Sequence, residues 1–396
     1  MSPNFLRGEK NNMKIGLDRV QELKKQVKGK RVSVVCNISS VNSKYEHVVA
    51  VLKNCSAKVV SIMGPQHGFV MDKQDNMKES PHSEHDQIGV PVYSLYGDSR
   101  EPKDYMLKDT DVVIFDLQDV GARYYTFIYT MANTMRLCAE LNIPFLVLDR
   151  PNPINGFDVE GGIVVPGFES FVGMFPISNR HGMTVGELAY FFNEEFEINC
   201  KLKIIKMEGW KRSKYWDELK LEWIIPSPNM PYFETTLVYP GQCLLEATNI
   251  SEGRGTTRPF EIFGAPFISH SDFLKHSAIK SLKGCVLRPL YFEPTFNKFK
   301  GEVCKGFQIH VTDKSTFKPL KTSLAIIYAL YELCDEFRFT PPPYEYEFNK
   351  QPIDILLGSD VPRTMLSKGV DFKSFYSLAC KGDSPFKKRR QEHLIY

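Results

Sequence analysis

The chain has 396 residues, of which 42% are hydrophobic and 24% are charged. This is the composition of an ordinary globular protein, and it excludes a disordered or fibrous chain. The 50 Lys and Arg residues nearly balance the 47 Asp and Glu residues, so the net charge of +3 offers no basic excess for binding nucleic acid. The length favours two domains.

The first residues and the cysteines bear on the compartment. The N-terminal stretch is polar and lacks the apolar core of a signal peptide, and no apolar run is long enough to cross a membrane. The nine cysteines include no C-x-x-C pair, which argues against a zinc or redox site. We therefore expect a cytoplasmic protein with no membrane partner, no metal and no cofactor. The basic run over 387–390 is expected to be a solvated tail.

The first part of the chain alternates between helical and strand patterns. Apolar residues at positions 17, 20, 23 and 27 predict a helix, and a capping box at Thr184 and Glu187 predicts the start of another. Helices are predicted over 16–28, 44–54, 126–141 and 184–196, and strands over 31–38, 58–63, 90–96, 111–117, 144–148 and 202–206. This alternation predicts an α/β domain over residues 1–235, with a parallel sheet covered on both faces.

The pattern changes near residue 235. A turn-rich polar stretch follows, and beyond it strands are predicted over 285–291 and 306–311 and a helix over 320–337. We expect a smaller α+β domain over residues 236–396.

Conspicuous polar motifs follow the predicted strands. GPQHG follows the strand over 58–63, DLQD follows the strand over 111–117, and DRPNP follows the strand over 144–148. Ligands of open α/β sheets bind at the carboxyl edge of the strands, so the site is predicted there. The chain has no G-x-G-x-x-G, P-loop, G-x-S-x-G or H-E-x-x-H motif, which argues against standard dinucleotide, kinase, hydrolase-fold and zincin sites.

Asp116 closes a predicted strand, so its carboxylate is expected to point into the mouth of a cleft. Arg123 is a candidate for binding an anion and Tyr124 for stacking on a sugar. The alternative is that Asp119 caps the next helix and pairs with Arg123. Asp149 and Arg150 follow the predicted strand over 144–148. They are expected either to bind groups of a ligand or to form a purely structural ion pair with each other.

His67 is a candidate for proton transfer, or else a structural hydrogen-bonding group. His181 precedes a helix whose N–H groups could receive an anion. The densest polar stretch, LLEATNISEGRGTTRPFE, contains Glu246 and Glu261 as acid/base or nucleophile candidates, and its glycines permit close approach of the backbone.

Taken together, the motifs resemble a known family, the NamZ-type exo-β-N-acetylmuramidases. The resemblance runs from about residue 16 to the end and rests on motifs in a shared order: GPQHGF, VYSLYG, FDLQDVGARYYTF, LDRPNP, VEGG, HGMTVGEL, MEGW, PSPNMP, YPG, LLEATNISEGRGTTRPFE and GAPF. It implies a Rossmann-like N-terminal domain, a smaller C-terminal domain and an active site between them. It also implies hydrolysis of a terminal β-linked N-acetylmuramic acid from peptidoglycan fragments.

On the basis of this resemblance, Asp116 and Glu246 are predicted to be catalytic as general acid or nucleophile, and His67 is predicted to be catalytic in an orienting role. The predicted substrate-binding residues are Gln66, Gln118, Arg123, Tyr124, Asp149, Arg150, Asn152, Glu160, His181, Asn229, Asn249, Arg254 and Glu261. The substrate's lactyl carboxylate could contact an arginine, and its acetamido group could replace one of the two carboxylates that glycosidases ordinarily use. The predicted partner is therefore a small carbohydrate or muropeptide, and no oligomeric state is predicted.

One position departs from the family pattern. Many members have Pro-Glu-His-Gly where this chain has Gln66, and an amide cannot exchange a proton in acid/base catalysis. Asp72, Asp75 and Glu79 lie on the same predicted loop as possible substitutes. Two further interpretations stay open: a non-catalytic amino-sugar or muropeptide-binding protein, and a hydrolase acting on another bond, such as an amidase or phosphoesterase.

Overall fold

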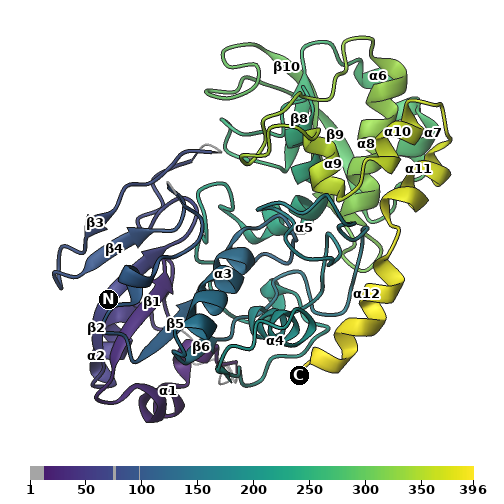
Figure 1. The fold of residues 1–396 in the computed structure, drawn as a ribbon. Coiled ribbons are helices and arrows are strands. Elements are labelled where there is room, and N and C mark those ends of the chain that lie inside the picture. The colour runs from purple at the N-terminus through teal and green to yellow at the C-terminus, as the bar shows by residue number, and fades with distance from the viewer. Residues whose placement is uncertain (1–12, 75–76, 98) are drawn as a thin grey trace, which may run out of the picture.

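The computed structural model describes residues 13–74, 77–97 and 99–396 and contains a seven-stranded sheet in its N-terminal part (Figure 1). The strand order is β3-β4-β2-β1-β5-β6-β7, and every pair is parallel except the antiparallel β3–β4 pair. The strands are β1 (Arg31–Cys36), β2 (Lys58–Gly64), β3 (Ser83–Glu84), β4 (Pro91–Ser94), β5 (Val112–Asp116), β6 (Phe145–Leu148) and β7 (Leu202–Ile205). The predicted α/β class is thereby confirmed.

Helices cover both faces of this sheet. Successive strand residues point to opposite faces, so Val34 packs into one apolar cluster and Val35 into another. The first cluster includes side chains of α1 (Val20–Val27) and α2 (Val48–Asn54), and the second those of α3 (Phe127–Glu140) and α4 (Val185–Glu195). Short 3₁₀ turns η1 (Gly16–Asp18), η2 (Asp104–Leu107) and η3 (Trp216–Glu218) lie in the connections.

The capping box predicted at the start of α4 is present. Glu187 N donates to Thr184 Oγ1 at 3.2 Å, and Thr184 N donates to Glu187 Oε2 at 3.0 Å. The helix therefore begins where the local sequence predicted.

The C-terminal part is built on a small antiparallel sheet with the order β8-β10-β9. Its strands are β8 (Ile262–Ala265), β9 (Cys285–Phe292) and β10 (Cys304–Val311), and β8 was not predicted. The helical segments are α5 (Phe233–Gln242), η4 (Cys243–Ala247), α6 (His270–Lys275), α7 (Ser277–Lys280), α8 (Pro319–Leu333), α9 (Pro352–Leu357), α10 (Val361–Leu366), α11 (Phe372–Ala379), α12 (Asp383–Arg389) and η5 (Arg390–His393). The proposed boundary near residue 235 falls inside α5, and the division into two domains stays a prediction.

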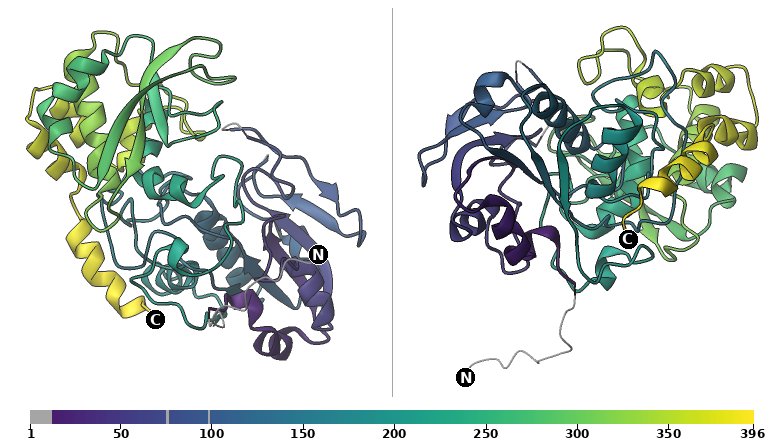
Figure 2. Two further views of the ribbon diagram at one scale, coloured as in Figure 1. Left: turned by 180° about the vertical axis from the view of Figure 1, so that it is seen from behind. Right: turned by 60° about the horizontal axis from the view of Figure 1, so that its bottom comes forward.

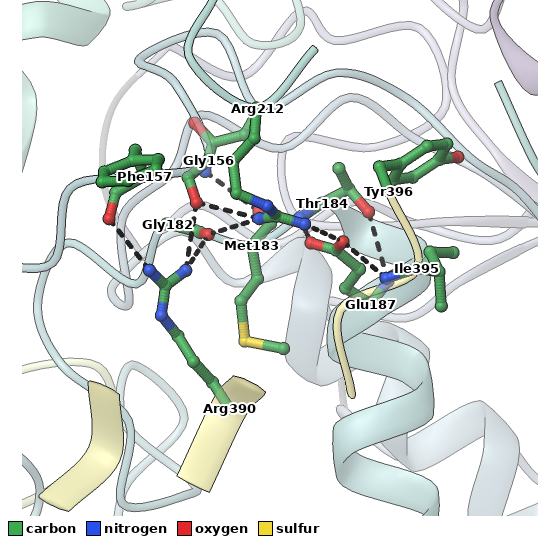
Figure 3. Close-up of polar contacts among 12 residues, drawn as sticks. Gly156, Phe157, Gly182, Met183, Thr184, Glu187, Arg212, Arg390, Ile395 and Tyr396 are labelled. Carbon is green, nitrogen blue, oxygen red and sulfur yellow. Dashed lines mark hydrogen bonds and ion pairs between the residues drawn. The ribbon is translucent and has the colours of Figure 1, made fainter. Parts of the chain in front are cut away.

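The last segment of the chain returns to the N-terminal part. Figure 2 shows α12, in yellow, running from the small-sheet region back to the region of the large sheet. The expectation of a solvated tail over 387–390 is wrong for Arg390, which is 2% exposed. Its guanidinium donates to the carbonyl oxygens of Gly156, Phe157 and Gly182 (Figure 3).

Two more contacts hold the same segment. Ile395 N donates to Glu187 Oε1 at 3.0 Å, and Glu187 also pairs with Arg212 (Figure 3). The Tyr396 hydroxyl donates to Asp149 Oδ2 at 2.7 Å. The C-terminal segment therefore packs against the loops at the carboxyl end of β6.

Candidate active site

A cavity with about 490 Å³ of space between its atoms, part of which is open solvent, lies beside the carboxyl ends of β2 and β5. Its walls come from both parts of the chain. The residues that line it are Gln66, His67, Tyr124, Tyr125, Thr126, Phe127, Val172, Ser227, Asn229, Met230, Tyr239, Cys243, Glu246, Arg254, Phe260, Tyr344 and Glu345. Six of the predicted site residues meet here: Gln66, His67, Tyr124, Asn229, Glu246 and Arg254.

Glu246, on η4, is the predicted catalytic carboxylate that lies in the cavity. Its Oε1 accepts a hydrogen bond from Arg254 Nη2 at 2.5 Å, and its Oε2 accepts one from the Tyr344 hydroxyl at 2.7 Å. Hydrogen bonds of this kind fix the orientation of a carboxylate. Glu246 is therefore held in one orientation by Arg254 and Tyr344.

The glycines on either side of Arg254 shape this part of the wall. Gly253 and Gly255 have φ of 80° and 79°, in the left-handed region that favours glycine. A Cβ on Gly255 would come within 2.6 Å of the Phe296 carbonyl oxygen. The expected close approach of the backbone is confirmed, and it brings the loop before β10 against the Arg254 loop.

Glu345 is a second carboxyl group in the cavity, and sequence reasoning missed it. Its Oε2 accepts a hydrogen bond from the Tyr96 hydroxyl at 2.8 Å. Burial raises the pKa of Glu345, the Tyr96 hydrogen bond opposes the rise, and the nearby charge of Glu246 adds to it. Glu345 therefore holds its proton to higher pH than an exposed glutamate does.

Gln66 connects Glu345 to the N-terminal part. Its Nε2 donates to Glu345 Oε1 at 3.4 Å, and its Oε1 accepts from the Thr126 hydroxyl at 2.7 Å. The amide thus lies next to a carboxyl group supplied from far along the chain, at the position where the resemblance implies a glutamate.

His67 lies beside Gln66 in the cavity wall. Its Nδ1 is 2.7 Å from the Lys73 carbonyl oxygen, so Nδ1 must carry the hydrogen. Burial lowers the pKa of His67 to about 4, which makes the imidazole neutral near pH 7 with Nε2 as the acceptor.

Asp116 lies away from the cavity, contrary to the expectation that it points into a cleft. It is fully buried, and Arg150 donates to both its oxygens, from Nε at 2.6 Å and from Nη2 at 2.9 Å. Asp116 and Arg150 thus bind each other across two neighbouring strand ends. The Asp116 carboxylate is therefore closed off from solvent and lies outside the cavity lining.

Arg123 also does not reach the cavity. Its guanidinium donates to the carbonyl oxygens of Gly162, Ile177 and Leu356 at 2.6–3.0 Å. The alternative pairing with Asp119 is not what the structure shows, because Asp119 Oδ2 accepts from Gly121 N at 2.7 Å and forms a local turn. Arg123 instead ties α9 to the N-terminal part.

Asp149 is likewise an internal group. Its carboxylate accepts from Arg150 N, Gly186 N, the Thr184 hydroxyl and the Tyr396 hydroxyl. Burial raises its pKa to about 7, although these hydrogen bonds oppose the rise. Asp149 therefore organises the loops after β6.

The remaining predicted substrate-binding residues support loops and helix ends outside the cavity lining. Glu160 accepts from the backbone N–H groups of Leu320 and Lys321, and so satisfies the N-terminus of α8. Three amides donate to backbone carbonyl oxygens: Gln118 to those of Asp119 and Pro151, Asn152 to that of Met183, and Asn249 to that of Glu336. His181 Nε2 lies 3.2 Å from Asp119 Oδ2. Glu261 accepts hydrogen bonds from Thr235 Oγ1 and Arg258 Nη1.

Asp72 and Glu79, two of the proposed substitutes for the glutamate that the resemblance implies, do not line the cavity. Asp72 is exposed and pairs with Lys73, and Glu79 accepts from the Tyr346 hydroxyl at 3.1 Å. Asp75 lies outside the described residues.

Within the described part of the chain, no cluster of three or more His, Cys, Asp or Glu residues could hold a metal ion. The helices in that part include none long and apolar enough to span a bilayer.

Comparisons with known proteins identify the family. The chain belongs to the NamZ family of exo-β-N-acetylmuramidases, because the family's N-terminal model matches residues 32–234 and its C-terminal model matches residues 237–396. The resemblance found in the motifs is thereby confirmed.

A named relative is the peptidoglycan β-N-acetylmuramidase NamZ of Bacillus subtilis strain 168. It is 42% identical over 391 residues, which cover 98% of this chain and 92% of that protein. Two DUF1343 family proteins of Bacteroides fragilis NCTC 9343 have similar crystal structures. One has a TM-score of 0.88 at 30% identity and covers 98% of this chain and all of that chain. The other has a TM-score of 0.76 at 27% identity and covers 97% of this chain and 99% of that chain.

Proposed function

We propose that the protein is a glycoside hydrolase that releases a terminal N-acetylmuramic acid, or a related amino sugar, from peptidoglycan fragments. The observation that carries this proposal is the presence of Glu246 and Glu345 in one cavity, with different partners. Two carboxyl groups in different environments are the usual equipment of a glycosidase. The relative from Bacillus subtilis, named as a peptidoglycan β-N-acetylmuramidase, supports the same substrate class.

In this proposal Glu345 is the general acid. Burial raises its pKa, which favours the protonated form that a general acid needs to protonate the leaving oxygen. Tyr96 and Gln66 both donate to Glu345 and fix its orientation. The missing glutamate at position 66 is thus replaced by a carboxyl group that the Gln66 amide itself contacts.

Glu246 is the second carboxylate. Arg254 and Tyr344 fix its orientation, as a base, a nucleophile or an electrostatic stabiliser of the developing positive charge requires. If the substrate's acetamido group acts as the nucleophile, Glu246 needs only to stabilise the developing positive charge. Neutral His67 adds a hydrogen-bond acceptor, and Asp116 is not carried into the mechanism.

Arg254 is the proposed contact for the lactyl carboxylate of muramic acid. Of the three arginines predicted to bind the substrate, Arg254 is the one that lines the cavity, and its Nη1 has no hydrogen-bond partner among the described residues. Tyr239 and Phe260 add aromatic walls to the same cavity, and rings of this kind pack against sugars at low entropic cost.

We place the reaction in peptidoglycan recycling in the cytoplasm. All nine cysteines are free, a usage typical of a reducing compartment. Cell fractionation with antibody detection tests this placement.

The alternative is a non-catalytic amino-sugar or muropeptide-binding protein, and the observation that favours it is the amide at Gln66. Turnover of a chromogenic β-N-acetylmuramide distinguishes the two. Release of N-acetylmuramic acid supports the hydrolase. Measurable binding of N-acetylmuramic acid without any turnover overturns it and supports the binding protein.

A further inference from the structure

Lys298 lies on the loop between β9 and β10, outside the cavity lining, and its ammonium group is enclosed by oxygen atoms. It donates to the carbonyl oxygens of Leu245 at 2.8 Å and Ile250 at 3.1 Å, and to Glu252 Oε2 at 2.8 Å. The Glu246 carbonyl oxygen lies 3.4 Å away. One ammonium thus fastens the backbone on both sides of the catalytic candidate Glu246.

Glu252 extends this contact towards the cavity. Its side chain is 2% exposed, and its Oε1 lies 3.2 Å from Arg254 Nε. Burial alone would raise the pKa of Glu252, but the charges of Lys298 and Arg254 hold it below its ordinary value. Arg254 in turn donates to Glu246, so four charges of alternating sign follow one another from Lys298 to Glu246.

The backbone holds the two loops together independently of these charges. Thr295 N and the Thr295 hydroxyl both donate to the Gly255 carbonyl oxygen at 2.9 Å. The contact explains how a loop more than forty residues along the chain delivers Lys298 to this point. Loss of the Lys298 charge therefore leaves a backbone anchor in place.

We propose that Lys298 and Glu252 are positioning residues that set the orientation of Glu246 through Arg254. The inference rests on the proposed hydrolase function. Arg254 is shared between two carboxylates, and Lys298 neutralises one of them. When Lys298 is absent, the buried Glu252 has Arg254 as its remaining cation and draws it away from Glu246.

The experiment compares K298M, E252Q and the double variant K298M/E252Q in turnover of a chromogenic β-N-acetylmuramide. We expect K298M to lower kcat by about tenfold, equivalent to about 1.4 kcal/mol, with little change in KM. The double variant should recover most of kcat, because the neutral amide that E252Q introduces no longer competes for Arg254. K298R, which keeps the charge, should retain more activity than K298M.

The control is K300M, since Lys300 is an exposed lysine on the same loop. Its kcat should match the wild type. A K298M variant with normal kcat, or a double variant at least as impaired as K298M, overturns the proposal.

A second readout separates this proposal from the hydrolase proposal. The Nε–H resonance of Arg254, assigned with R254K in a ¹⁵N-arginine-labelled protein, should move in K298M and return in the double variant, whether or not the protein turns over substrate. An unmoved resonance overturns the positioning role. An inactive wild type with the expected resonance changes overturns only the hydrolase proposal.

Discussion

Gln66 Nε2 lies 3.4 Å from Glu345 Oε1, although the two residues are separated by 279 positions in the chain. The amide comes from the end of β2 and the carboxyl group from the segment before α9. The position at which the resemblance implies a glutamate is therefore a neighbour in space of the Glu345 carboxyl group. The first two predictions follow from this contact.

Glu345→Gln should remove the general acid and leave the fold intact, because a glutamine oxygen can still accept from Tyr96. We expect kcat for a muramyl disaccharide to fall by about 10²–10⁴-fold. A dinitrophenyl β-muramide, whose leaving group needs no proton, should lose far less. An equal loss on both substrates would show that Glu345 does not donate the proton.

Gln66→Glu should move the basic limb of the kcat/KM pH profile upward, by roughly one pH unit. A carboxylate at this distance disfavours ionisation of Glu345, so the acid stays protonated to higher pH. The control is Q87E, which adds the same charge at an exposed position. If the basic limb of the pH profile does not move, Glu345 is not the titrating acid. If the wild-type protein is inactive and Q66E creates activity, the natural protein is a binding protein.

Asp116→Asn should act on stability rather than on chemistry. It breaks one side of a buried bidentate ion pair with Arg150, which costs about 3–5 kcal/mol in the free energy of unfolding. Urea unfolding measures the loss, and kcat per folded molecule should stay at the wild-type value. D111N is the matched control, because the Arg31–Asp111 pair is partly exposed and screened by water. A large fall in kcat with normal stability would restore Asp116 as a catalytic residue.

Asp149→Asn should change how stability depends on pH. Burial raises the pKa of Asp149 to about 7 in the folded state, against about 4 in the unfolded chain. The unfolded chain therefore releases this proton first, and Asp149 makes the protein progressively less stable as the pH rises from about 4 to about 7. The amide in D149N does not titrate, so the stability of this variant relative to wild type should rise by about 3 kcal/mol between pH 5 and pH 8. Urea unfolding at several pH values tests this, and parallel curves for the two proteins would contradict it.

Local patterns predicted six of the seven strands of the large sheet, all but β3, because those signals lie within a few residues of one another. The buried run that became β5 and the capping box of α4 are examples. The same reasoning failed at Asp116, which does close its strand. Whether its carboxylate faces a cleft depends on Arg150 at the end of the neighbouring strand, and strand order is not a local property.

Part of the cavity was predictable for a related reason. Glu246 and Arg254 lie on one dense polar loop with glycines where the backbone turns sharply, and that pattern marked the loop as functional. Glu345 had no such signal. It stands in a stretch of prolines, tyrosines and glutamates, and only the contacts with Tyr96 and Gln66 distinguish it from a surface acid.

The docking of the C-terminal segment has a consequence for biosynthesis. Tyr396 binds Asp149 across 247 residues of chain, and Arg390 satisfies three carbonyl groups of loops that precede and follow Gly162. During translation these loops emerge long before the groups that complete them. The large sheet can therefore form while the chain is still being made, but the loops at its carboxyl edge reach their final arrangement only after α12 has left the ribosome.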